Sequence, residues 1–135
     1  MKNLASVFLL LIFFSVLFYS GCKDTITGDE IDARIIPDTN VSYSANIQPV
    51  LNIKCANSGC HDDATRAASI SLTTWAYTTL DPNVVFPGKP ENSRLVWAIE
   101  GRSGVKPMPP IGYATLTINQ ITGIKTWIAE GAKNN

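Results

Sequence analysis

Two cysteines and a histidine stand close together in the segment Cys55-Ala-Asn-Ser-Gly-Cys60-His61. Each thiol can add to a vinyl group of a porphyrin, and an imidazole directly after the second thiol can then ligate the haem iron. The common form of this motif is C-x-x-C-H, whereas four residues separate Cys55 from Cys60 here. Ser58-Gly59 allows the longer segment to loop outward. The segment therefore predicts covalent attachment of a haem, with His61 as the proximal iron ligand.

A second iron ligand is available in Met108. His61 is the only histidine of the chain, and Met108 is the only methionine besides Met1. Met108 lies in Lys106-Pro107-Met108-Pro109-Pro110, where the prolines disfavour a helix and predict a stiff loop. A methionine taken alone is more commonly a residue that fills a gap in a core. Beside the Cys-Cys-His cluster we interpret Met108 as the distal iron ligand.

Ligation by both His61 and Met108 would leave no open iron position for a substrate, so the sequence predicts electron transfer rather than an enzyme. A thioether ligand also favours the reduced iron and raises its reduction potential. We expect redox protein partners in the periplasm or the membrane. Lys54 and Lys106 flank the predicted ligands and are candidates for steering an acidic partner.

Other interpretations of the cysteine pair remain open. A Cys55–Cys60 disulfide would make the chain a haem-free, disulfide-stapled binding or accessory lipoprotein, but it leaves the position of His61 unexplained. A displaceable Met108 would open the iron to peroxide or a diatomic gas and give a haem sensor or peroxidase. The sequence offers no second histidine as an acid–base group for that chemistry. Structural zinc and blue-copper sites need more ligands than the segment supplies.

The N-terminus has the pattern of a bacterial lipoprotein signal. Lys2 precedes an apolar run over residues 4–19, and Ser20-Gly21-Cys22 follows it. Residues 1–21 are therefore predicted to be a signal peptide, with Cys22 as the lipidated first residue of the mature chain. The apolar run is shorter than the roughly 20 residues of a membrane-spanning helix. We expect an extracytoplasmic protein that is lipid-anchored to the bacterial membrane and faces the periplasm or the cell surface.

Charge and composition divide the remaining chain into a tether and one domain. The whole chain has 11 basic and 11 acidic residues and no basic run, so a nucleic-acid partner is not expected. Residues 22–40 are polar, acidic and poor in aromatics, which predicts a flexible tether after the lipid. Residues 41–135 are of the length of one small domain.

Apolar periodicity predicts that this domain is helical. A first helix is expected over 45–52, capped by Asn46 or Ser44, and it leads directly to Cys55. Another is expected over 91–100, and a short one after Thr73. The clearest is the last helix, where Thr117 and Gln120 form a capping-box pattern. Its apolar stripe and its C-terminal stop are Ile121, Ile124, Ile128 and Gly131.

With these pieces in order, the chain resembles the small cytochrome c domains of planctomycete and Bacteroidetes secreted proteins. The resemblance covers residues 42–132 and rests on blocks in family order: Ser44-Ala-Asn-Ile47-Gln-Pro49-Val-Leu51, Cys55 to His61, Pro87-Gly88-Lys-Pro90-Glu-Asn-Ser93, Met108-Pro109-Pro110, Leu116-Thr117 through Trp127-Ile128, and Gly131-Ala132. It implies an all-α, cytochrome c-like fold in which the N- and C-terminal helices pack around the haem. It also implies one covalent haem c attached through Cys55 and Cys60, with His61 as proximal ligand and Met108 as distal ligand.

Overall fold

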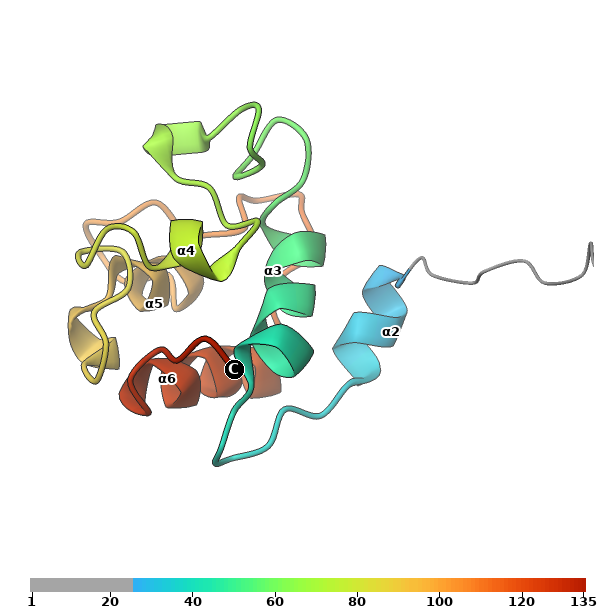
Figure 1. The fold of residues 1–135 in the computed structure, drawn as a ribbon. Helices are drawn as coiled ribbons and strands as arrows, with labels where there is room; N and C mark the ends of the chain where they lie inside the picture. Colours follow the sequence, from blue (N-terminus) through green and yellow to red (C-terminus); the bar gives the residue numbers. More distant parts are fainter. Residues whose placement is uncertain (1–25) are drawn as a thin grey trace, which may run out of the picture.

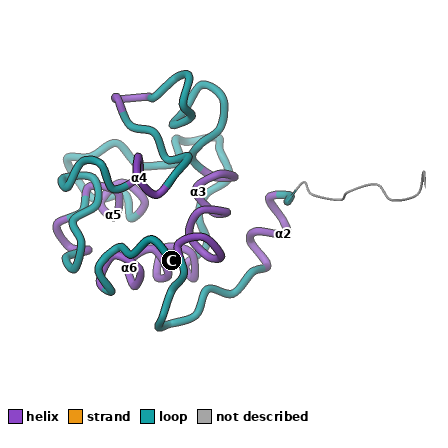
Figure 2. Tube along the Cα trace, viewed as in Figure 1, coloured by secondary structure: helices purple, strands orange, loops and turns teal. Residues whose placement is uncertain are grey.

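The computed structural model describes residues 26–135, which form helices and loops without a strand (Figures 1 and 2). The predicted all-α class is confirmed for these residues. The predicted signal peptide over 1–21, Cys22 and the start of the tether lie outside them. No helix within the described part is long and apolar enough to cross a membrane. The elements in chain order are α2 (Gly28–Ala33), a π-helical turn (Tyr43–Ile47), α3 (Gln48–Lys54), a 3-10 turn (Ala67–Ser69), α4 (Trp75–Thr78), a 3-10 turn (Pro90–Asn92), α5 (Arg94–Ile99) and α6 (Ile118–Ala129).

The C-terminal helix α6 forms as predicted. The Thr117 hydroxyl accepts a hydrogen bond from the Gln120 N–H, and the Gln120 side chain accepts one from the Thr117 N–H, which completes the capping box. Gly131, at a φ of 101°, follows the helix, and its N–H bonds to the Ile128 carbonyl. The buried face of α6 carries Gln120, Gly123, Ile124, Trp127 and Ile128.

The first helix of the predicted domain differs from the expectation in its start and its cap. A π-helical turn begins at Tyr43, and the regular α-helix α3 starts only at Gln48. Pro49 is the second residue of α3, and it has no N–H to continue the hydrogen bonds of the preceding π-helical turn. The capping side chain is Ser42, which accepts from the Ala45 N–H, whereas Asn46 accepts from the Ser42 N–H. The prediction of Asn46 or Ser44 as cap was therefore wrong, although α3 does lead directly to the predicted haem segment.

The predicted flexible tether is wrong from Gly28 onward, because this segment packs against the domain. Helix α2 has its own capping box and lies against α3 (Figure 1). Ile31 and Ile36 are only 1% and 3% exposed. The Asn119 side chain of α6 accepts a hydrogen bond from the Ile36 N–H at 2.8 Å and donates one to the Ile36 carbonyl at 3.0 Å. Few apolar residues occur in this largely polar segment, so its average composition concealed the two that are buried.

Two shorter helices complete the frame of the site. The predicted helix over 91–100 is divided into the 3-10 turn Pro90–Asn92 and the helix α5. Ser93 separates them, because its hydroxyl accepts from the Phe86 N–H and donates to the Lys89 carbonyl. Helix α4 is capped by Thr74, one residue after the predicted Thr73. Helix α5 packs on α6, and the loop after α3 extends beyond the end of that helix (Figure 1).

Candidate functional site

A cavity of about 370 Å³ contains three of the predicted haem residues in its wall. Cys55 follows the end of α3, His61 lies in the next loop and Met108 lies in the loop after α5. A cavity of this volume is within the range of small-molecule and cofactor sites. The rest of its wall is mostly apolar and consists of Ala68, Ile70, Leu72, Val84, Leu95, Ala98, Ile99, Gly104 and Val105, with Arg94 and Lys106.

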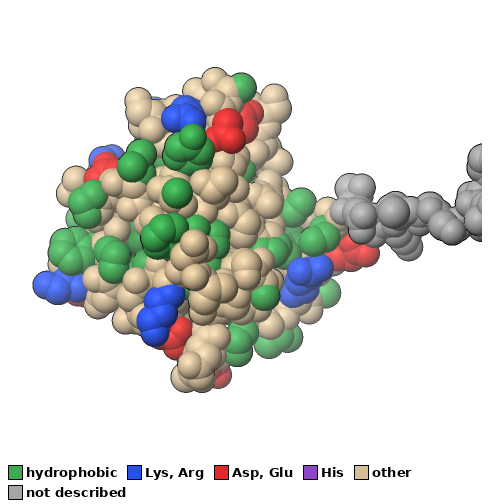
Figure 3. Space-filling view, in the orientation of Figure 1, with side chains coloured by type: hydrophobic (Ala, Val, Ile, Leu, Met, Phe, Trp, Pro, Cys, Tyr) green, Lys and Arg blue, Asp and Glu red, His purple; other side chains and the backbone are tan. Residues whose placement is uncertain are grey.

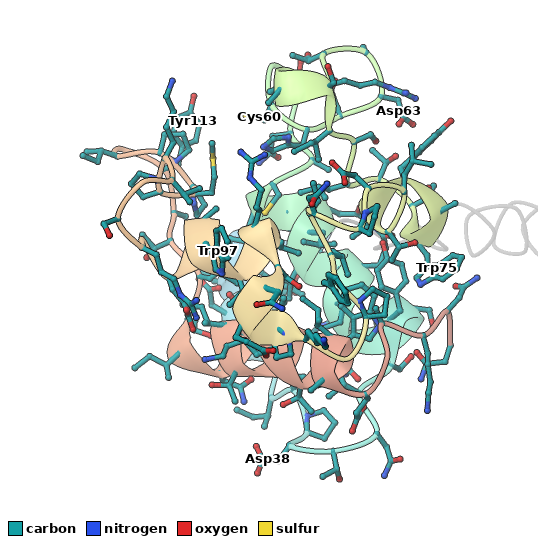
Figure 4. All side chains as sticks on the ribbon, turned by 90° about the vertical axis from the view of Figure 1, so that its left-hand side faces the viewer. Asp38, Cys60, Asp63, Trp75, Trp97 and Tyr113 are labelled. Carbon is teal, nitrogen blue, oxygen red and sulfur yellow. The ribbon has the colours of Figure 1, made fainter. Side chains whose placement is uncertain are left out.

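A second cavity of about 130 Å³ shares Cys55, His61 and Met108 with the first and adds Cys60. The fold therefore brings all four predicted residues to two adjoining cavities. Tyr113 also lines the smaller cavity, and Figure 4 shows Cys60 and Tyr113 on neighbouring loops at one end of the molecule. Residues far apart in the sequence meet here because α5 and its following loop lie opposite the end of α3.

The four residues between the cysteines form a compact turn. The Cys60 N–H bonds to the Asn57 carbonyl at 2.9 Å, and the His61 N–H returns to the Cys55 carbonyl at 3.1 Å. Gly59 has a φ of 84°, a backbone conformation that side-chain-bearing residues rarely adopt, and Ser58-Gly59 thus permits the turn. With four residues between the cysteines, the backbone of His61 therefore still lies within hydrogen-bond distance of the backbone of Cys55.

The ring of His61 is oriented by a backbone carbonyl. Its Nδ1 lies 3.2 Å from the Ile70 carbonyl oxygen, and the Leu72 N–H bonds to the His61 carbonyl at 2.9 Å. When Nδ1–H donates to that carbonyl, Nε2 keeps its lone pair free for a metal. The His61 side chain is half-buried at the cavity wall. Its surroundings therefore select the tautomer that a metal-ligating imidazole requires.

A backbone hydrogen bond fixes the position of Met108. Its N–H donates to the Ala98 carbonyl of α5 at 2.9 Å, so the loop is anchored to a helix that also lines the cavity. The Met108 side chain is half-buried, and the following peptide bond to Pro109 is cis. Met108 thus lies on an anchored loop, as the prolines predicted, and its side chain contributes to both cavities.

The two thiols differ in their surroundings and are both free. Cys55 is buried, and burial raises its pKa to about 12, with a smaller contribution from the negative charge of Cys60. Lys54 opposes this increase. Cys60 is half-buried in the loop. The Cys55 thiol is therefore protonated at neutral pH in the folded, haem-free chain.

The charge of Lys54 is neutralised inside the protein. Its side chain is 1% exposed, and its ammonium donates to the Asp32 carboxylate at 2.8 Å. This hydrogen bond is the main reason that the pKa of Asp32 is lowered. The hypothesis that Lys54 steers a partner is therefore wrong, because its ammonium is buried and paired. Asp32 was missed as a residue of this region because it belongs to the segment predicted to be a tether.

The sequence analysis did not name several residues of the cavity wall as site residues. The apolar periodicity of one predicted helix could have indicated two of them. Leu95 and Ile99 belong to the apolar stripe that predicted the helix over 91–100. Arg94 lies one turn before Ala98, on the same helix face. Leu72 and Val84 come from loops without periodicity, so only the tertiary structure places them at the cavity.

The residues of the two cavities fit a haem. A haem is a broad, largely apolar ring system around an iron, and the cavities present apolar walls with an imidazole and a thioether. Two thiols suited to covalent attachment stand at the same place. His61 and Met108 would hold the iron, and Cys55 and Cys60 would hold the macrocycle.

Comparison with known proteins supports this interpretation. Residues 58–112 match the family described as Planctomycete cytochrome C. The matched segment contains Cys60, His61 and Met108, whereas Cys55 and the helices α3 and α6 lie outside it. No curated protein and no solved structure matches the chain. A cytochrome c domain implies binding of haem c. The predicted resemblance is thus confirmed, and the match supports a planctomycete-type cytochrome c domain in this chain.

Proposed function

We propose that this domain transfers electrons through one haem c, attached through Cys55 and Cys60 and ligated by His61 and Met108. The observation that carries the proposal is that His61 and Met108, which come from separate loops, line the same apolar cavity beside Cys55. The family match adds support, because a cytochrome c domain suggests haem-based electron transfer.

The residues of the chain have separate tasks in this proposal. The Ile70 carbonyl orients the His61 ring through Nδ1, and the Ala98 carbonyl anchors the backbone of Met108. The apolar wall limits the access of water to the site. The bound haem supplies a ferric–ferrous couple whose reduced form the thioether favours. Because His61 and Met108 would both hold the iron and leave no position for a substrate, the proposed role is electron transfer and not catalysis.

The proposed cellular setting follows from the N-terminal sequence. Residues 1–21 have the pattern of a lipoprotein signal, and Cys22 would carry the lipid. The packed domain begins at Gly28, so the chain between it and Cys22 reaches at most about 20 Å. The domain would therefore stay close to the membrane surface on the extracytoplasmic side. Its redox partners would be membrane proteins or periplasmic proteins that approach this surface.

The test is to express the full chain together with a haem-attachment system and to record its visible and near-infrared spectra and its intact mass. We expect c-type bands that persist on denaturation, and the mass of one added haem. Met108→Ala should lose the near-infrared sulfur-to-iron band, whereas Ile111→Ala, an exposed change on the same loop, should keep it. A colourless protein lighter by two hydrogens would indicate a Cys55–Cys60 disulfide and would refute the proposal.

The contribution of each thiol can be tested separately. We expect Cys55→Ala and Cys60→Ala each to retain haem through one thioether bond, with absorption bands shifted toward those of a singly attached haem. An unchanged spectrum in Cys55→Ala would show that Cys55 takes no part in attachment. That outcome would correct the attachment without refuting ligation by His61.

A further inference from the structure

The larger cavity combines an apolar wall with two cationic side chains. Arg94 and Lys106 line it, and the wall contains no acidic residue. Among residues 26–135, neither cation has a carboxylate oxygen within the 4.0 Å limit of an ion pair. Four other basic residues of the described chain do have such partners: Lys54, Arg66, Arg102 and Lys125. The described chain has five basic residues without such a partner, and two of them, Arg94 and Lys106, lie at the larger cavity. The other three, Arg34, Lys89 and Lys133, do not line it.

Backbone hydrogen bonds hold the chain at Arg94 and two residues after Lys106. Arg94 is the first residue of α5, and its N–H donates to the Asn83 carbonyl at 3.0 Å. Ala98 lies one turn later on the same helix face and also lines the cavity. Lys106 lies two residues before Met108, whose N–H is bonded to the Ala98 carbonyl. Both cations thus belong to the rim formed by α5 and the loop that follows it.

The cationic rim and the second attachment cysteine line different parts of the site. Cys60 lines only the smaller cavity, whereas Arg94 and Lys106 line only the larger one. A haem c carries its thioether bonds on one side of the macrocycle and its two propionate carboxylates on the other. A haem bound with its thioether side near Cys60 would therefore direct its carboxylates toward the cationic rim.

We propose that Arg94 and Lys106 bind the haem propionates. This inference rests on the proposed function, because it requires a haem in the cavity. The planar guanidinium of Arg94 suits a bidentate interaction with a carboxylate, and the ammonium of Lys106 acts as a point charge. The pairing would neutralise carboxylates at the edge of an apolar site. It would also raise the reduction potential, because a nearby cation favours the ferrous state, which has one positive charge fewer.

The experiment compares Arg94→Gln, Lys106→Gln and the double variant with the wild type, all expressed as the full chain with a haem-attachment system. Arg34→Gln and Lys133→Gln are the matched controls, because both residues are exposed and neither lines the cavity. The readouts are the midpoint potential as a function of pH and the propionate bending band in resonance Raman spectra. Arg94→Lys serves as the conservative variant that keeps the charge.

We expect each cavity variant to lower the midpoint potential and the double variant to lower it most. The pKa of the propionate-linked step should rise by about 1–3 units, because a carboxylate loses its cationic neighbour. The frequency of the propionate bending band should shift in the cavity variants and should be unchanged in both control variants. Compared with Arg94→Gln, Arg94→Lys should restore most of the midpoint potential, because it keeps the charge. It should restore less of the wild-type position of the propionate bending band, because the bidentate geometry is lost.

The outcomes separate the two proposals. A wild-type protein without haem would refute the proposed function, and this inference with it. A wild-type protein with haem, whose cavity variants have the same potential curve and Raman band as the controls, would refute only the role of Arg94 and Lys106. If the double variant does not mature, the single variants and Arg94→Lys give the same comparison.

Discussion

Replacing Gly123 by alanine should destabilise the protein, although alanine is the better helix former. Gly123 lies inside α6, where alanine would be more favourable by about 1 kcal/mol on helix propensity alone. An added Cβ would stand 2.5 Å from Cγ2 of Ile36 and 2.9 Å from both its Cβ and its Cδ1. Overpacking of this kind costs about 1–3 kcal/mol.

Ile36 has little freedom to move away from the new methyl group. Its backbone N–H and carbonyl are both bonded to the side chain of Asn119, which lies one turn before Gly123 on α6. The cost should therefore be near the upper end of that range. We expect a net loss of about 1–2 kcal/mol in the free energy of unfolding for Gly123→Ala.

A double-mutant cycle isolates this contact. Ile36→Ala alone should cost about 2–5 kcal/mol, because it removes a buried side chain. It also removes Cγ2 and Cδ1, the first of which makes the closest contact, but it leaves the Cβ of residue 36 at 2.9 Å from the added methyl group. Gly123→Ala should therefore cost less in that background than in the wild type, and the expected coupling between the two positions is about 1 kcal/mol.

The assay is urea unfolding followed by far-ultraviolet circular dichroism, with the slopes compared among the variants. Gly28→Ala is the matched control, because an added Cβ there meets nothing within 4 Å. Effects of Gly123→Ala and Ile36→Ala that add to within about 0.5 kcal/mol would refute the close packing of Ile36 on α6. A stabilising Gly123→Ala in the wild-type background would refute it as well.

Two further predictions concern ionisable groups near the cavities. Asp32→Asn should cost about 1–3 kcal/mol, because it leaves the buried Lys54 ammonium without its carboxylate partner; Asp29→Asn, on the exposed side of α2, is the control. Since the folded-state pKa of Asp32 is lowered from 3.8, the contribution of this pair should be present above about pH 4 and lost as the pH falls through the lower folded value. Unfolding curves measured between pH 7 and pH 2 should therefore show a shallower loss of stability for Asp32→Asn than for the wild type. In the haem-free chain, Cys55 should be alkylated by iodoacetamide at pH 8 at least about tenfold more slowly than in the unfolded chain, because burial raises its pKa to about 12 and leaves less thiolate, although the remaining thiolate is more nucleophilic. Peptide mass spectrometry measures the rates, and equal rates for Cys55 in folded and unfolded chains would contradict its burial.

The charges on the face of the protein in Figure 3 are mixed, with basic side chains scattered and acidic ones beside several of them. This distribution agrees with the equal numbers of basic and acidic residues in the sequence. A partner that docks on this face would therefore meet no extended region of one sign. Arg94 and Lys106 differ from the other surface charges in that they line the larger cavity, which the sequence does not show.

The features that the sequence determined by itself are those whose partners lie within a few residues of each other. The capping box of Thr117 and Gln120, the stop at Gly131 and the adjacency of Cys60 and His61 are local, so their chemistry can be inferred before any fold is known. The helical class follows from such local signals as well. The π-helical turn before α3 was missed because a regular helix start has nearly the same sequence pattern.

Only the tertiary structure decided which distant residues meet. It placed Met108 and His61 at one cavity, it buried Ile31 and Ile36 of the supposed tether, and it paired Lys54 with a carboxylate from α2. The physical reason is that burial and pairing depend on the surface a residue finds elsewhere in the chain. Periodicity within one segment carries no information about that surface.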